Sequence, residues 1–137
     1  MPASSQNPVK NDPDGRVWLV AVAAPKDYQA IEDAVGLATP VPDAWDTVRT
    51  PSGADILLTG VGKANAAGAV AYKLDPSRHI GVISLGIAGA LPGSKCEIGD
   101  VVCAVTSSFA DEGVLTKGKF QSCADLGFAA FESGKDQ

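Results

Sequence analysis

Short apolar runs alternate with amphipathic stretches along this chain, and their spacing predicts strands that alternate with helices. The run Val17 to Ala24 is almost continuously apolar, which is typical of a strand covered on both faces. Pro25 opens the next segment as the first residue of a helix, and Gly36 provides its stop. Three apolar side chains recur on one face of that helix: Tyr28, Ile31 and Val35.

The pattern continues with four further strands and one more helix. The strands are expected at Asp46–Thr50, Ile56–Thr59, Ile80–Leu85 and Val101–Ser108. The helix is expected at Lys63–Leu74, with an apolar stripe of small residues: Ala66, Ala67, Val70, Ala71 and Leu74. This order predicts an α/β fold with a mixed central sheet flanked by helices.

Length and composition favour one domain preceded by a tail. The chain has 137 residues, which is a normal length for a single domain. Residues 1–15 are polar, rich in turn formers and without the apolar core of a secretory signal, so a flexible tail is expected before a domain over 16–137. The longest strongly apolar stretch, Val17 to Ala24, is far shorter than the roughly 20 residues that cross a bilayer. A cytoplasmic protein without membrane contact is therefore expected.

Charge and metal-ligating residues exclude several classes of function. The formal net charge is -5 and no Lys/Arg cluster offers a basic stripe, so nucleic acid is not an expected partner. Cys96, Cys103 and Cys123 lack CxxC spacing, and His79 is the only histidine, so no zinc site is predicted. His79 stands in the polar segment DPSRHI and is expected to be solvated. Neither a metal nor a cofactor is predicted.

Two glycine-rich turns carry the strongest indication of a ligand site. The segments TGVGKANAAG, from Thr59, and SLGIAGALPG, from Ser84, each follow an apolar strand. Glycine lets a ligand approach the backbone closely, and ligands gather at the carboxyl ends of strands in open α/β sheets. The two turns therefore predict a pocket, although a tight turn without a ligand remains an alternative for the first.

The first turn does not fit a dinucleotide site. Its pattern is Gly60-x-Gly62-x-x-Asn65, so the third glycine of the fingerprint is missing. Where an acid would bind the ribose, about twenty residues later, the chain has His79 and Ile80. What remains is a helix N-terminus whose amides can face an anion or a hydroxyl-rich ligand.

Four motifs, in this order, carry a resemblance to a known family: TGVGKANAA, SLGIAGALPG, IGDVV and FADEGV. As a set they resemble the purine nucleoside phosphorylase and nucleosidase superfamily, and within it the futalosine hydrolases of menaquinone biosynthesis, from about Val17 to Phe128. The resemblance implies an α/β sandwich, cleavage of the bond between a ribose and a purine-type base, and a homodimer. The acid that protonates the base in relatives comes from a later part of the chain than this match, which implies that 16–137 is the N-terminal part of an incomplete fold.

The same resemblance implies residues that contact the nucleoside. Ile87, Ala88 and Gly89 resemble the turn beside the sugar and base. Val61 would lie near the 5′ substituent, and Val114 resembles a loop position that touches the ligand.

Asp27 is the catalytic candidate that the resemblance implies. It follows the first strand, where related nucleosidases place a glutamate that activates the attacking water. The shorter side chain is a departure from the family, and a misplacement of about 1 Å can cost roughly a hundredfold in rate. The alternative is an acid at a helix N-terminus that only stabilises the helix dipole.

Hydrolysis is favoured over phosphorolysis. The phosphorylases of the family place an arginine and a hydroxyl residue where this chain has Ser84 and Ile87, and the first glycine turn has no nearby arginine. The sequence therefore predicts a hydrolase of futalosine-like nucleosides. A nucleoside-binding fragment without the leaving-group acid and a nucleoside phosphorylase remain the alternatives.

Overall fold

A computed structural model describes residues 13–105, 107 and 109–128 of the chain. The chain divides into two compact units, Met1–Gly89 and Ala90–Gln137, and each is described by itself. The expected α/β class, with a mixed sheet flanked by helices, is confirmed in the first unit. Residues 1–12 of the expected tail lie outside the described residues.

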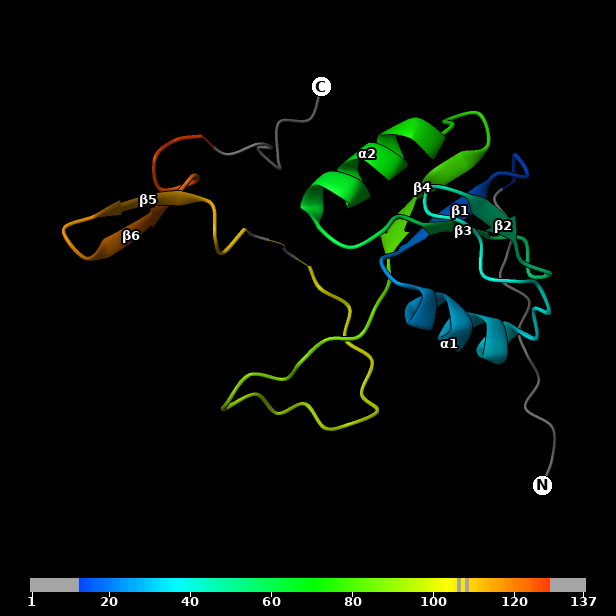
Figure 1. The fold of residues 1–137 in the computed structure, drawn as a ribbon, viewed down its shortest axis with the longest axis horizontal. Helices are drawn as coiled ribbons and strands as arrows, with labels where there is room; N and C mark the ends of the chain where they lie inside the picture. The colour runs from blue at the N-terminus through cyan, green and yellow to red at the C-terminus, as the bar shows by residue number, and fades with distance from the viewer. Residues whose placement is uncertain (1–12, 106, 108, 129–137) are drawn as a thin grey trace. The chain divides into compact units, whose positions relative to one another are not determined.

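The first unit contains a four-stranded sheet and two helices (Figure 1). Its elements are β1 (Val17–Val22), α1 (Pro25–Val35), β2 (Thr47–Arg49), β3 (Asp55–Leu58), α2 (Lys63–Lys73) and β4 (His79–Ser84). The strand order is β2-β3-β1-β4, with β1 parallel to β3 and β4, and β2 antiparallel to β3. The six elements expected up to Leu85 are thus all present.

The central strands are apolar at consecutive positions. Because successive side chains of a strand point to opposite sides, both faces of the sheet carry apolar side chains. On one face, Val22 of β1 and Ile56 of β3 pack with Tyr28 of α1. On the other face, Leu19 and Leu57 pack with Ala69 of α2. Figure 1 shows α1 and α2 on opposite faces of the sheet. The continuous apolar character of β1 therefore reflects burial under a helix on each side.

Helix α1 matches the sequence pattern closely. Pro25 occupies its first turn, and Gly36 ends it in the left-handed conformation, with φ 67° and its N–H bonded to the carbonyl of Glu32. Tyr28 is buried, Ile31 is half-buried, and Val35, at the end of the helix, is 37% exposed.

The orientation of helix α2 differs from the expected one. Ala69 is its buried residue, whereas Ala67 and Ala71 of the expected stripe are exposed. A helix with small residues on several sides has a weak apolar periodicity. Contact with Leu19 and Leu57 sets its rotation instead.

The second unit contains an antiparallel hairpin of β5 (Gly113–Thr116) and β6 (Lys119–Ser122). Lys117 and Gly118 connect the strands and both have positive φ, 48° and 78°, as a two-residue hairpin turn requires. The sequence pattern did not predict this hairpin. The expected strand Val101–Ser108 was wrong over its described residues 101–105 and 107, which form no strand. Apolar β-branched residues favour a strand only where a neighbouring strand can pair.

No helix within the described ranges is long and apolar enough to cross a membrane.

Candidate functional site

A hollow in the first unit lies at the carboxyl ends of β1, β3 and β4 and has a volume of about 390 Å³. Its lining residues are Ala21, Ala23, Asp27, Thr59, Ala66, Ser84, Leu85, Gly86 and Ile87. The chain leaves β1 toward α1 and leaves β3 toward α2, and these helices cover opposite faces (Figure 1). Such a divergence opens a crevice at the carboxyl ends of the strands, where ligands bind in α/β sheets.

Asp27 lies in the first turn of α1, is half-buried and lines this hollow. Its Oδ2 accepts a hydrogen bond of 3.1 Å from the backbone N–H of Ala24. This contact caps the helix N-terminus, where a negative charge is stabilised. The sequence left open whether Asp27 caps the helix or faces a ligand, and the geometry combines a helix cap with a place in the hollow.

Thr59 and Ser84 add hydroxyl groups from two further strand ends. Thr59 is buried, and its Oγ1 lies 3.1 Å from the carbonyl oxygen of Val22 and 2.9 Å from that of Gly60. A hydroxyl has one proton, so the Thr59 oxygen keeps lone pairs for a further donor. Ser84 is exposed at the end of β4, and the next residue, Leu85, donates its N–H to the carbonyl of Ala21.

Sequence reasoning had not placed Thr59 in the site. The signal was present, because Thr59 is a polar residue that directly follows the buried strand β3. It is the same strand-end signal that pointed to the glycine turns.

The structure brings two of the expected site residues to the hollow, Asp27 and Ile87. Ile87 is 96% exposed, so it forms part of the rim. Val61 is exposed in the first turn, and Ala88 and Gly89 are exposed beyond β4, and none of the three is among the lining residues. Val114 lies in β5 of the second unit rather than in a loop. Contact of these residues with a nucleoside stays a prediction.

The two glycine turns differ in what they require of glycine. In the first, Gly60 and Gly62 have φ values of 81° and 105°, which side chains rarely adopt. Asn65, at the place of the missing third glycine, donates from Nδ2 to the carbonyl of Val61 at 2.8 Å and holds this turn. In the second, Gly86 lines the hollow, and a Cβ on it would meet nothing within 4 Å. At Gly86 the structure therefore shows neither a special backbone conformation nor a close contact that requires glycine.

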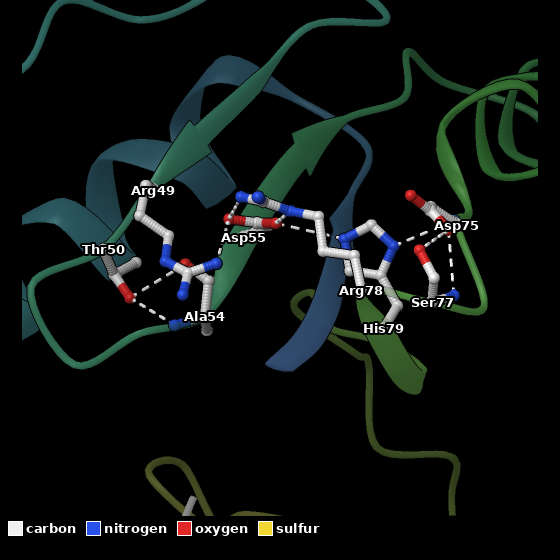
Figure 2. Close-up of polar contacts among 8 residues, drawn as sticks. All are labelled: Arg49, Thr50, Ala54, Asp55, Asp75, Ser77, Arg78 and His79. Carbon is white, nitrogen blue, oxygen red and sulfur yellow. Dashed lines mark hydrogen bonds and ion pairs between the residues drawn. The ribbon is translucent and has the colours of Figure 1, made fainter. Parts of the chain in front are cut away.

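An ionic cluster around the buried Asp55 lies where β3 and β4 begin, at the end of the strands away from the hollow (Figure 2). The carboxylate of Asp55 accepts two hydrogen bonds from Arg78, of 2.6 and 3.0 Å, and one of 3.1 Å from Arg49. His79 Nε2 lies 3.0 Å from Asp55 Oδ2. Burial raises the pKa of Asp55, but hydrogen bonds from Arg78, His79 and Arg49 outweigh it and lower the pKa to about 2.

The expectation that His79 is solvated was wrong, because its exposed fraction is 6%. Its Nδ1 accepts the backbone N–H of Asp75 at 3.0 Å, which places the ring proton on Nε2, facing Asp55. The polar flank DPSR did not reveal that His79 itself opens β4 and turns toward the buried Asp55. Because each member of the cluster has a partner, the cluster is structural.

Within the described residues, no group of three or more His, Cys, Asp or Glu side chains is placed to hold a metal ion. Of the cysteines, Cys96 and Cys103 are exposed and Cys123 is half-buried, and all three are free thiols.

The chain is similar to a curated futalosine hydrolase from Acidothermus cellulolyticus, with 36% identity over 121 residues. The match covers 88% of this chain and 48% of that protein, so the chain spans about half the length of the relative. The similarity supports a nucleosidase-like relationship. No family model and no solved structure matches the chain.

Proposed function

We propose that this chain forms the sugar-side part of the active site of a nucleosidase that hydrolyses a purine-type, futalosine-like nucleoside in menaquinone biosynthesis. The observation that carries the proposal is the hollow, which gathers Asp27 and the glycine turn from Ser84 to Ile87 at the carboxyl ends of three strands. The similarity to a futalosine hydrolase over 88% of the chain supports the same chemistry.

In this proposal Asp27 guides the attacking water. Hydrolysis of an N-glycosidic bond passes through an oxocarbenium-like sugar, attacked by water from one side while the base leaves from the other. The Asp27 carboxylate accepts a proton from that water as the bond to the sugar carbon forms. The hydroxyls of Thr59 and Ser84, which also line the hollow, are suited to hydrogen bonds with the sugar hydroxyls.

The charge of the lining favours water over phosphate. Asp27 is the only charged residue among the described residues that line the hollow, and no Lys, Arg or His is among them. A phosphate dianion needs cationic or multiple N–H partners, and a carboxylate in the same hollow would repel it. A nucleoside phosphorylase is therefore the less favoured alternative.

A second candidate function is nucleoside binding without turnover. Departure of the base requires an acid to protonate it, and Asp27 is the only carboxyl group among the described lining residues. A site with this lining would bind the sugar but release the base slowly. We further propose that the protein is cytoplasmic and that it forms a homodimer. Light scattering tests the homodimer, and a monomer at all concentrations would contradict it.

The decisive experiment measures release of the free base from futalosine and from methylthioadenosine by the purified chain, with and without inorganic phosphate. The proposal expects release from futalosine that does not depend on phosphate. Saturable nucleoside binding without release would support the binding fragment, and release that requires phosphate would support the phosphorylase. A chain that neither binds nor cleaves either nucleoside would contradict the proposal.

A further inference from the structure

The Asp27 carboxylate lies among apolar walls. Asp27 is half-buried, and most of the residues that line the hollow with it are apolar: Ala21, Ala23, Ala66, Leu85 and Ile87. Apolar walls lower the effective dielectric constant around a charge, which strengthens its attraction for an opposite charge. Asp27 therefore acts more strongly on a ligand in the hollow than an acid in open solvent would.

This carboxylate keeps part of its capacity for a ligand. Its Oδ2 accepts the N–H of Ala24, and its Oδ1 has no hydrogen bond or ion pair with another described residue. An ionised carboxylate has roughly four acceptor sites. Because the described lining holds no Lys, Arg or His that would neutralise Asp27, the charge that the hollow offers to a ligand is negative.

The remaining polar side chains of the described lining limit which bases can leave. They are the hydroxyl groups of Thr59 and Ser84, and the Thr59 proton is directed to the carbonyl oxygen of Val22 or Gly60. A hydroxyl group is far too weak an acid to protonate a departing base efficiently at neutral pH. A neutral nucleoside needs that proton. A riboside with a positively charged ring nitrogen does not, because its base leaves as a neutral molecule.

Building on the proposed sugar site, we infer that the hollow selects N-ribosides whose base carries a positively charged ring nitrogen at the glycosidic bond, and that this chain hydrolyses them in preference to neutral nucleosides. The volume of about 390 Å³ lies in the range of small-molecule sites, roughly 300–1,000 Å³. Across an intervening water, at roughly 6 Å, the attraction between a carboxylate and such a ring still exceeds the thermal energy several-fold at the effective dielectric constant of a protein surface.

The hydrolysis of such a riboside needs no general acid. The water oxygen forms a bond to the anomeric carbon of the ribose while the bond from that carbon to the ring nitrogen breaks. The electron pair of the broken bond passes to the ring nitrogen and cancels its positive charge. One water proton passes to the Asp27 carboxylate and from there to solvent, so the products are ribose, the neutral base and a proton. Positive charge stays in the hollow from the substrate to the oxocarbenium-like transition state, and Asp27 stabilises it throughout.

Nicotinamide riboside and its dihydro form are the matched probes, because they share the ribose and differ by one hydride on the ring and hence in ring charge. Titration calorimetry with the purified chain should show that the cation binds about tenfold or more tightly than the neutral dihydro form. After subtraction of spontaneous hydrolysis, base release should be at least about 100-fold faster from the cation, since a missing general acid costs about 10²- to 10⁴-fold.

Asp27→Asn removes the charge, and its amide oxygen can still accept the N–H of Ala24. We expect the two ribosides to bind this variant within about twofold of each other. Asp33→Asn is the matched control, because Asp33 is an exposed acid of the same helix, and it should keep the tenfold difference. Salt provides a test without a variant. Raising the ionic strength from about 0.01 M to about 1 M shortens the Debye length from roughly 30 Å to 3 Å, which should weaken binding of the cation but not of the dihydro form.

Equal affinities of the two ribosides for the parent chain would overturn the inference, as would a preference for the cation that survives Asp27→Asn or ignores salt. So would the absence of saturable binding of the cation, or base release from it no faster than the spontaneous rate. The proposed hydrolysis of futalosine-like nucleosides fails separately. A chain that cleaves the cationic riboside but neither binds nor cleaves futalosine satisfies this inference and contradicts that proposal.

Discussion

The Arg78 side chain holds the buried carboxylate of Asp55 with two hydrogen bonds, one from Nε at 2.6 Å and one from an Nη at 3.0 Å (Figure 2). Asp55 is the first residue of β3, and Arg78 directly precedes β4. Since β1 lies between these strands in the sheet, the pair spans the amino end of β1. Arg78 also accepts the N–H of Val17, the first residue of β1, at its carbonyl. Through its side chain and its carbonyl, Arg78 thus connects the starts of three neighbouring strands.

Asp55→Asn is expected to destabilise the first unit. The amide keeps the shape of the side chain but loses the charge that Arg78, Arg49 and His79 surround. The two arginine side chains are about half exposed and regain water, so the loss should be about 2–3 kcal/mol, below the range for fully buried pairs. Chemical unfolding at neutral pH measures it. A free energy of unfolding within error of the parent chain would contradict the proposed role.

The same carboxylate predicts a loss of stability in acid. The folded pKa of Asp55, about 2, lies below its ordinary value of 3.8. The stability that this carboxylate contributes is therefore complete above the unfolded pKa and is lost as the pH falls through the folded pKa. Integrated over that interval, the loss is about 2 kcal/mol between roughly pH 5 and pH 1. Unfolding measured at several pH values should show the parent chain approaching Asp55→Asn as the pH falls. A constant difference between them across that window would refute the assignment.

The sequence predicted the elements of the first unit but not this cluster. Apolar runs located β1, β3 and β4 because burial between two helices removes polar residues from both faces of a strand. Nothing in the sequence pairs Asp55 with Arg78, which lie 23 positions apart, because their contact depends on the strand order. His79 was misjudged for the same reason, since its burial is decided by tertiary structure and its polar neighbours precede the strand.

The candidate site shows a similar division. The resemblance implied Asp27 and Ile87 as site residues, and both line one hollow at the carboxyl ends of the strands, where ligands gather in α/β sheets. The strand-end rule applies equally to Thr59, which opens the first glycine-turn motif but was assigned no role in the site. In the second unit the apolar run from Val101 predicted a strand that is absent over its described residues, whereas the turn at Lys117-Gly118, which the sequence pattern did not predict, brings two strands together.

Tyr28→Phe is expected to lower the free energy of unfolding by about 1 kcal/mol, the net value of one hydrogen bond. Tyr28 is fully buried, and its hydroxyl lies 2.7 Å from Oγ1 of Thr39. This bond fastens the segment after α1 to the core of the helix. Tyr72→Phe is the matched control, because Tyr72 is exposed on α2, and it should be neutral. Equal effects of the two substitutions would show that the Tyr28 bond does not contribute.

Gly62→Ala is expected to destabilise the chain more than Gly36→Ala. A Cβ at either position would meet nothing within 4 Å, so the comparison isolates backbone strain. Gly36 has φ 67° and ψ 34°, where a side chain costs about 1 kcal/mol. Gly62 has φ 105° and ψ 154°, a region almost restricted to glycine, where the cost is about 1–3 kcal/mol. Chemical unfolding of both variants decides the order, and the reverse order would mean that the first glycine turn relaxes without loss.

Asp27→Asn is expected to reduce turnover of a futalosine-like nucleoside by about 10²- to 10⁴-fold, the usual contribution of a general base. The amide oxygen can still accept the N–H of Ala24, which Asp27 now binds, so the fold should be retained. Asp33→Asn is the control, because Asp33 is an exposed acid of the same helix. Asp27→Glu should keep turnover, since the carboxylate remains and glutamate also suits the third position of a helix. If Asp27→Asn and Asp33→Asn have the same rate while both stay folded, Asp27 serves only as the helix cap, and the water must be guided from elsewhere.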